Sequence, residues 1–343
     1  MPPAEKHILE IDSAELAFGE RRILSGVYLL VETGGVTAVL GRNGCGKSCL
    51  MKILSGSLKA GFCSMRIDGK WHRRFTEKEI RYLPQHPFIP GWLRLERALG
   101  DFRLQREDLE RWFPEFISLR GTRIGELSGG EQRILECFII LRSPARFILL
   151  DEPFSALDQH LRFRLERELH QTLREFGKTA IFVSHDRDEV YRLADRIVVM
   201  EHGRVETSGT KKDVFRDPHT RAAAMLTGCK NISRAEILPD GSVDALDWGI
   251  TLHKPGFSGG CVGIRMHDVR PGRGENEVLC DVAEVIENPF SFTVLLRPAG
   301  RTDTTPVGWE MEKDVWRAQQ ATQLWVHFPA EGLLALEETE GQA

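Results

Sequence analysis

Eight consecutive residues, 41–48, have the types and spacing that can hold the phosphates of a nucleotide. They read GRNGCGKS and fit the pattern G-x-x-x-x-G-K-[ST]. The glycines let the backbone approach phosphate oxygens closely, so that successive amide groups can point at them. Lys47 would bridge the outer phosphates, and the Ser48 hydroxyl would hold Mg2+. A glycine-rich turn without a ligand is the alternative. The expected nucleotide-binding residues here are Gly41, Arg42, Asn43, Gly44, Cys45, Gly46, Lys47, Ser48 and Cys49.

Strand-like and helix-like runs around this loop predict an α/β domain. The apolar run 36–40 reads as a buried strand that feeds the loop, and apolar residues within 50–54 give the next helix one buried face. Helical spacing over 92–116, with Pro114 near its end, predicts a helical insert at about residues 86–142. Further strands are expected at 8–11, 14–18, 27–31, 65–67, 80–83, 147–150, 179–183, 197–200 and 205–207, and further helices at 160–176 and within 211–226.

Polar residues stand at the ends of several of these runs. Ser128 and Glu131 have the spacing of a capping box, so a helix is expected to begin there. Asp151 and Glu152 follow directly after the apolar run 147–150. Because ligands bind at the carboxyl ends of strands in open α/β sheets, both carboxylates are expected to face the ligand.

The pattern of apolar residues along the chain changes after residue 228. With 343 residues the chain exceeds the size at which one core usually keeps growing, so two domains are expected. Beyond residue 228, short apolar runs broken by glycine, proline and aspartate replace the helical periods. We therefore expect an α/β domain over residues 1–228 and a small all-β domain, in the size range of small barrels, over residues 229–343.

Composition excludes several classes of protein. The formal net charge of -4 and the pI near 6.3 give no overall basic field, so nucleic acid is not an expected partner. The seven cysteines include no C-x-x-C pair and are odd in number, which argues against a disulfide framework or a zinc ribbon and suits a reducing cytosol. No run approaches the roughly 18–20 apolar residues that span a bilayer. Membrane contact is therefore expected only through a partner.

The order of the motifs resembles the ATP-binding cassette (ABC) ATPases. The phosphate loop is followed by a glutamine at a strand end, by LSGGE at 127–131, by the strand that ends in Asp151 and Glu152, and by Ser-His at 184–185. The resemblance covers residues 1–228. It implies a P-loop NTPase core, with an antiparallel β region before it and an α-helical insert within it, that uses ATP and Mg2+.

The resemblance also implies a role for each matching side chain. Asp151 would fix Mg2+ through water, with Ser48 and Gln85 as further metal contacts, and Glu152 would be the general base that polarises the attacking water. His185 would contact the γ-phosphate and hold the water in line. The alternative for Glu152 is a carboxylate that only keeps the edge of the sheet in contact with water. For His185 it is a loop histidine without a ligand, and for Gln85 a surface glutamine. The expected catalytic residues are Lys47, Gln85, Glu152 and His185.

Other matching residues imply a site that is shared between two chains. Phe18 stands where the family stacks an aromatic ring, commonly Tyr, on adenine; an ordinary core phenylalanine is the alternative. The helix that begins after Ser128 would receive the γ-phosphate bound by the opposite subunit. Since the chain has one loop and one LSGGE, hydrolysis would need two copies head to tail. Expected at that interface are Ser128, Gly129, Gly130, Glu131 (where Gln is also common) and Asp158.

The β-rich tail narrows the resemblance to importers. Residues 229–233 and 263–269 look like the TOBE-like tail domains of importer ATPases, above all the molybdate, tungstate and sulfate group. The implied partners are a second copy, two membrane-embedded permease chains and, indirectly, a substrate-binding protein, at the cytoplasmic face of the membrane. A structural or dimerising barrel is favoured over a regulatory oxyanion site. The alternatives are another cargo (iron, polyamine, phosphonate or sugar) and a non-transport ABC ATPase.

Overall fold

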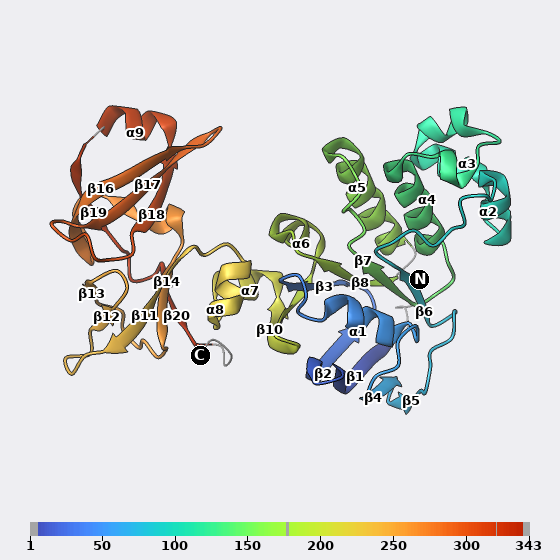
Figure 1. Cartoon of the computed structure of the whole chain (residues 1–343), viewed down its shortest axis with the longest axis horizontal. Helices are drawn as coiled ribbons and strands as arrows, with labels where there is room; N and C mark the ends of the chain where they lie inside the picture. Colours follow the sequence, from blue (N-terminus) through green and yellow to red (C-terminus); the bar gives the residue numbers. More distant parts are fainter. Residues whose placement is uncertain (1–5, 176–177, 320, 339–343) are drawn as a thin grey trace. The chain divides into compact units, whose positions relative to one another are not determined.

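The computed structural model describes residues 6–175, 178–319 and 321–338 of the chain (Figure 1). They form two compact units, Met1–Lys211 and Lys212–Ala343. Phe176, the predicted end of one helix, and residues 339–343 lie outside the described residues.

A six-stranded sheet organises the first unit, with the strand order β10-β9-β3-β8-β7-β6. All neighbouring pairs are parallel except β9 and β10, the strands expected at 197–200 and 205–207, which form an antiparallel hairpin. Every residue of β3, β7 and β8 is buried, as their continuous apolar runs predict. The strands are β3 (Val36–Gly41), β6 (Ile80–Leu83), β7 (Phe147–Asp151), β8 (Thr179–Ser184), β9 (Arg196–Glu201) and β10 (Arg204–Thr210).

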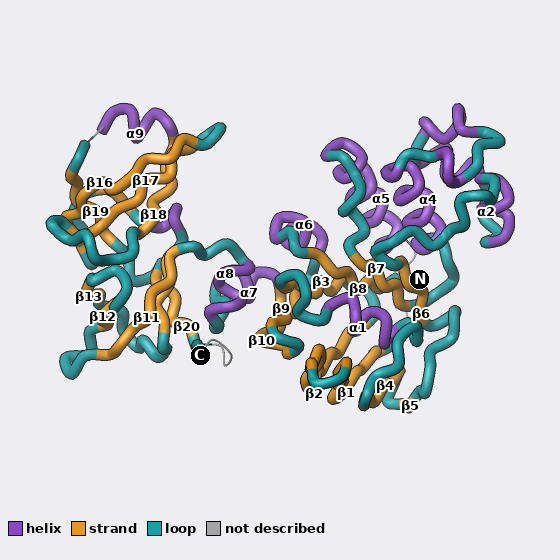
Figure 2. Tube along the Cα trace, viewed as in Figure 1, coloured by secondary structure: helices purple, strands orange, loops and turns teal. Residues whose placement is uncertain are grey.

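A four-stranded antiparallel sheet, in the order β2-β1-β4-β5, completes the core of this unit. The strands predicted at 8–11 and 14–18 form one strand with bulges rather than two, and this strand pairs with β2. Helix α1 (Lys47–Leu54) lies between the two sheets, where its apolar residues share one core with both (Figure 2). The strands are β1 (Ile8–Phe18), β2 (Arg21–Glu32), β4 (Phe62–Ile67) and β5 (Lys70–Trp71).

The helical insert is more broken than the spacing over 92–116 indicates. The chain leaves the first helix at Arg103, whose φ of 57° lies in the left-handed region, and Pro114 begins a 3-10 turn. Ser128 then caps a long helix, as predicted. The helices of the first unit after α1 are α2 (Leu95–Asp101), α3 (Arg106–Trp112), α4 (Gly129–Leu141), α5 (Gln159–Glu175) and α6 (Arg187–Leu193), with 3-10 turns at Pro114–Leu119 and Ile124–Glu126.

The second unit is built mainly from antiparallel strands, as expected. Two five-stranded sheets, β13-β12-β11-β14-β20 and β15-β19-β16-β17-β18, share one core that contains Trp248, Trp309 and Phe328, and together they resemble an OB-like barrel. One short helix, α9 (Lys313–Gln319), was not expected. The strands are β11 (Asn231–Ile237), β12 (Val243–Ala245), β13 (Ile250–Leu252), β14 (Cys261–Ile264), β15 (Arg270–Pro271), β16 (Glu277–Glu287), β17 (Ser291–Pro298), β18 (Val307–Glu312), β19 (Gln323–His327) and β20 (Leu333–Leu336).

The boundary between the two compact units lies after residue 211 of the chain, whereas the change in composition that predicted the boundary lies at 228. Two short helices, α7 (Lys211–Arg216) and α8 (Arg221–Leu226), account for the difference. The amide of Arg221 donates to the carbonyl of Glu337 at 3.0 Å. Arg265 donates to the carbonyl of Thr227 at 2.7 Å and also to that of Phe215. These bonds tie both helices to the β-rich unit.

Candidate active site

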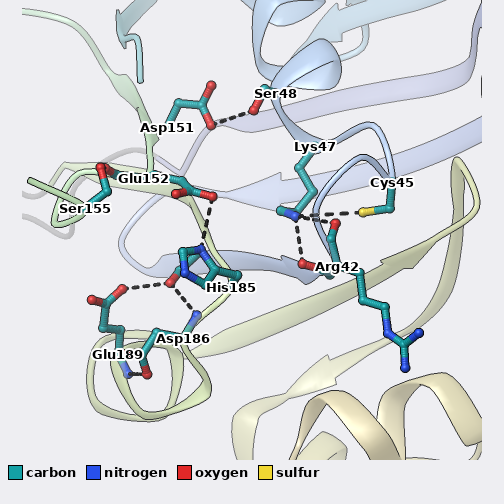
Figure 3. A network of polar contacts seen from close by, with 12 residues as sticks. Arg42, Cys45, Lys47, Ser48, Asp151, Glu152, Ser155, His185, Asp186 and Glu189 are labelled. Carbon is teal, nitrogen blue, oxygen red and sulfur yellow. Dashed lines mark hydrogen bonds and ion pairs between the residues drawn. The ribbon is translucent and has the colours of Figure 1, made fainter. Parts of the chain in front are cut away.

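The loop between β3 and α1 wraps around the ammonium group of Lys47. Lys47 is buried, and its Nζ donates to the carbonyls of Gly41 and Arg42 at 2.7 and 2.8 Å (Figure 3). A Cβ at position 41 would lie 2.4 Å from the carbonyl oxygen of Met200, so only glycine fits there. Gly46 has a φ of 105°, a backbone conformation that residues with a side chain rarely adopt. The glycines therefore allow the loop to close tightly around one positive charge.

A pocket of about 420 Å3 opens beside this loop. It brings Gln85 and Glu152, which come from the ends of β6 and β7, to the residues of the loop. A hollow of about 710 Å3 lies at the other end of β3, around Gly35 and Val36, and no predicted site residue lines it. The residues that line the smaller pocket are Arg21, Ile23, Asn43, Gly44, Gly46, Lys47, Ser48, Cys49, Gln85 and Glu152.

Two hydroxyl groups hold the carboxylate of Asp151. Ser48 Oγ donates to Asp151 Oδ1 at 3.0 Å, and the hydroxyl of Tyr82 donates to Asp151 Oδ2 at 3.0 Å. Asp151 is fully buried, and this burial raises its pKa, while the two hydrogen bonds act in the opposite direction. Burial and the nearby Asp151 carboxylate raise the pKa of Tyr82, which keeps its hydroxyl protonated as a donor. The carboxylate is therefore fixed in orientation from both sides.

Glu152 and His185 meet at the entrance of the same site. His185 Nδ1 lies 3.2 Å from Glu152 Oε1, and the side chain of Glu152 is 14% exposed (Figure 3). Glu152 has a φ of 48°, a left-handed conformation that costs about 1–3 kcal/mol in a residue with a side chain. Ser155 Oγ donates to the carbonyl of Glu152 at 3.1 Å. The backbone at Glu152 is thus held in an unfavourable conformation that aims its carboxylate at His185.

The Ser128–Glu131 segment lies elsewhere on the unit and forms its own network. The amide and the hydroxyl of Ser128 donate to Glu131 Oε2 at 2.7 and 2.8 Å, and the amide of Glu131 donates to Ser128 Oγ at 3.3 Å. Ser128 and Gly129 are exposed at the start of α4. Within the described residues, none of the four lines the pocket. The structure therefore does not bring this helix N-terminus to the phosphate loop of its own chain.

Two further predicted residues lie on the surface. Phe18 is 55% exposed at the hairpin between β1 and β2, which excludes the alternative of a core phenylalanine. It does not line the pocket, although Arg21 and Ile23 of β2 do. Asp158 is exposed, and its Oδ1 accepts from the amide of Leu161 at 2.9 Å, which caps α5.

Comparison with known proteins identifies the family. The sequence model of the ABC transporter family matches residues 24–155, from β2 to just beyond Glu152. The ferric-ion import ATP-binding protein FbpC of Streptomyces coelicolor is 31% identical over 261 residues, which are 73% of this chain and 74% of that protein. This chain belongs to the ABC transporter ATP-binding family. It is an ATPase of the ABC type that binds ATP.

Other relatives of this ABC ATPase carry the names of importers or share only its fold. The spermidine/putrescine import ATP-binding protein PotA of Bacillus cereus is 30% identical over 240 residues, 66% of this chain and 73% of that protein. A solved ATP-binding subunit of an ABC transporter superposes with a TM-score of 0.53 and 22% identity, over 61% of this chain and 92% of that one. A bacterial Atm1-family ABC exporter with ATP bound superposes with a TM-score of 0.57 and 22% identity. That match covers 65% of this chain and 42% of the exporter chain. The two structures show the fold alone.

Sequence reasoning about this ABC ATPase missed three side chains near the site. Tyr82 reads from the sequence as one residue of a strand, and only the structure shows its bond to Asp151. Arg133 and Glu136 are both buried in α4. A signal existed for this pair, because nearly all residues of α4 after Gln132 are apolar, and such a helix leaves no solvent face for two charges.

Proposed function

We propose that this chain is the ATP-hydrolysing subunit of an importer, and that two copies act head to tail on membrane-embedded permease chains. The observation that carries the proposal is the division of the site. Lys47, Ser48 and Glu152 line one pocket, with Asp151 bonded to Ser48 and His185 paired with Glu152, whereas the N-terminus of α4 is exposed and does not line it. A second copy can supply that helix end to the phosphates bound by the first.

Mg2+ fits the oxygens that meet at Asp151. Magnesium binds hard oxygen ligands and usually keeps several waters, so one or two protein side chains suffice beside the phosphates of ATP. Among the described residues, no group of three His, Cys, Asp or Glu side chains forms a closed metal cage. Ser48 Oγ and Asp151 Oδ1, 3.0 Å apart, would hold the ion directly or through water, with Gln85 at the pocket wall. The ion would neutralise charge on the β- and γ-phosphates.

Hydrolysis then follows from the chain's own residues. Lys47 now donates to the carbonyls of Gly41 and Arg42, and it would turn one of its donors to a phosphate oxygen when ATP binds. Glu152 would polarise the attacking water, because its carboxylate faces the pocket and His185 holds one of its oxygens. His185, with its ring 3.2 Å from Glu152, would contact the γ-phosphate and keep water, base and phosphate in line.

Transport into the cell is supported by the names of the relatives. FbpC and PotA are import proteins for ferric ions and for spermidine or putrescine. The tail motifs support an oxyanion such as molybdate, tungstate or sulfate, and uptake assays with all three classes of cargo decide between them. No helix within the described residues is long and apolar enough to cross a membrane. By likeness to these import proteins, we propose that the chain acts at the cytoplasmic face, held by its permease, with the tail (229–343) as a dimerising or regulatory TOBE-like domain.

Substitution of the proposed base tests the enzymatic part. Glu152→Gln keeps the shape of the side chain but removes the base, so ATP hydrolysis should fall by about 10²- to 10⁴-fold while ATP still binds. Phosphate release and equilibrium ATP binding would be measured on the full chain, alone and with its permease. Glu284→Gln, on an exposed strand residue of the second unit, is the matched control and should hydrolyse ATP normally. Near-normal hydrolysis by Glu152→Gln would refute the assignment.

A further inference from the structure

One guanidinium group in α4 is bonded to the backbone of two separate strand ends. Arg133 is 4% exposed. Its Nη1 donates to the carbonyl of Pro84 at 2.7 Å, and its Nη2 donates to the carbonyls of Asp151 and Glu152 at 2.8 and 3.0 Å. Its Nε donates to the carbonyl of Pro153 at 3.1 Å. The rigid, planar fork of arginine thus fixes the start of the Gln85 loop against the end of β7.

A carboxylate one turn further along α4 holds the other end of the same loop. Glu136 is fully buried, and its Oε1 accepts from the amides of Phe88 and Ile89 at 2.8 and 3.3 Å. Its Oε2 lies 3.7 Å from Arg133 Nη1 and has no hydrogen-bond partner among the described residues. Glu136 therefore lies beside the positive charge of Arg133, while its hydrogen bonds are directed at the loop.

These contacts place the two residues between three parts of the site. The loop 84–89 carries Gln85 and is held at Pro84 by Arg133 and at Phe88 and Ile89 by Glu136. Arg133 also holds the carbonyl of Glu152, whose backbone is in the left-handed conformation. Both side chains belong to the helix that begins at Ser128, so any movement of α4 acts on Gln85 and Glu152 together.

We propose that Arg133 and Glu136 are positioning residues, which we term the α4 clamp, and that the clamp sets Gln85 and Glu152 relative to bound nucleotide and passes movement of α4 to them. This inference rests on the proposed ATPase site. Neither side chain lines the pocket, so the clamp acts through the loop and through the backbone of Glu152. Small displacements of catalytic groups lower turnover strongly, whereas the phosphate loop that binds ATP is left unchanged.

Two substitutions separate the effect of the side-chain length of Glu136 from the effect of its charge. Glu136→Asp keeps the charge beside Arg133 but draws the carboxylate back from the loop by about 1.5 Å. Glu136→Gln loses the charge but keeps an oxygen that can accept from Phe88 and Ile89. Ile139→Val, which removes one methyl group from a buried residue of the same helix, is the matched control for packing.

The clamp predicts a specific pattern of rates in the full chain. Glu136→Asp should lower kcat about tenfold or more with the KM for ATP within about twofold, whereas Glu136→Gln should stay within about threefold of wild type in both. Exchange of the Phe88 and Ile89 amide hydrogens should be faster in Glu136→Asp alone. In a Gln85→Ala background, Glu136→Asp should lower kcat by less than about twofold further, because, among the described residues, the side-chain hydrogen bonds of Glu136 run only to that loop.

Three results would overturn the proposal. Glu136→Asp could match Ile139→Val in rate and exchange, Glu136→Gln could lose as much kcat as Glu136→Asp, or the effects of Gln85→Ala and Glu136→Asp could multiply fully. A wild-type chain that does not hydrolyse ATP would instead refute the proposed function. In that case, unchanged amide exchange at Phe88 and Ile89 in Glu136→Asp would still refute the clamp.

Discussion

The phosphate loop and the N-terminus of α4 are the two segments that we propose to bind phosphate, and they differ in what surrounds them. Lys47 is buried, and the Ser48 and Asp151 side chains beside it are bonded to each other. Ser128 and Gly129 are exposed, and the side-chain bonds of the cap run between Ser128 and Glu131. The loop is one wall of a pocket, whereas the described residues of the helix end do not line that pocket. The comparison supports our proposal that each chain holds one half of a site and offers the other half to a second copy.

Mixing two inactive variants tests this division most severely. Lys47→Ala removes the charge at the loop and Gly129→Asp puts a carboxylate at the exposed helix end, and each alone should lose about 10²- to 10³-fold in ATP hydrolysis. A Cβ at Gly129 meets nothing within 4 Å, so the second variant should fold.

In a head-to-tail dimer, a mixed pair contains one site with both halves intact. Refolded or coexpressed mixtures should therefore recover up to about a quarter of the wild-type phosphate release. Mixtures that recover nothing, while each variant remains folded and dimeric, would show that loop and helix end do not act in trans.

Loss of the Tyr82 hydroxyl should have an intermediate effect on the loop half. Tyr82→Phe leaves Asp151 Oδ2 without its donor, and a hydrogen bond to a charged group is worth enough to raise the Mg2+ concentration for half-maximal hydrolysis about tenfold. A Mg2+ titration of ATPase activity measures this half-maximal concentration. Tyr28→Phe, which removes an exposed hydroxyl bonded to Glu10, is the control. An unchanged Mg2+ requirement would mean that Ser48 alone suffices to orient Asp151.

The smallest expected effect is at Phe18. If its exposed ring stacks on adenine, Phe18→Ala should weaken ATP binding about 3- to 10-fold and leave the binding of inorganic triphosphate unchanged. Phe62→Ala, at another exposed aromatic residue of the same unit, should change neither. Equal loss of ATP and triphosphate binding would show that the ring supports the loop rather than the base.

Sequence patterns predicted those parts of the molecule that depend on interactions between residues close in sequence. The strand 80–83 agrees with β6 at both ends, and the run 147–150 gives β7 to within one residue, because buried parallel strands are continuous apolar runs. The capping box at Ser128 is present with both of its bonds. The pattern also predicted that Lys47, which follows β3, lies at the same edge of the sheet as Asp151 and Glu152 at the end of β7. Parallel neighbouring strands have their carboxyl ends at one edge.

Non-local interactions account for what the patterns did not predict. Spacing over 92–116 could not show that the helix breaks at Arg103. The bond from Tyr82 to Asp151 joins residues 69 positions apart. The partners of Arg133 are backbone carbonyls, which no side-chain pattern records. α9 spans only Lys313–Gln319, too short for a clear helical period.

The attachment of α7 and α8 to the β-rich unit determines where the chain can be cut. A fragment that ends at 228 would keep the two helices but lose Glu337 and Arg265, which bind Arg221 and Thr227. It would also uncover Ala224, which packs with Cys261, Leu334 and Leu336. A fragment that ends at 211 would leave both helices with the sheets that hold them. A catalytic module exchanged between such ATPases would therefore be shorter than the change in composition at residue 228 suggests, with its junction at the end of β10.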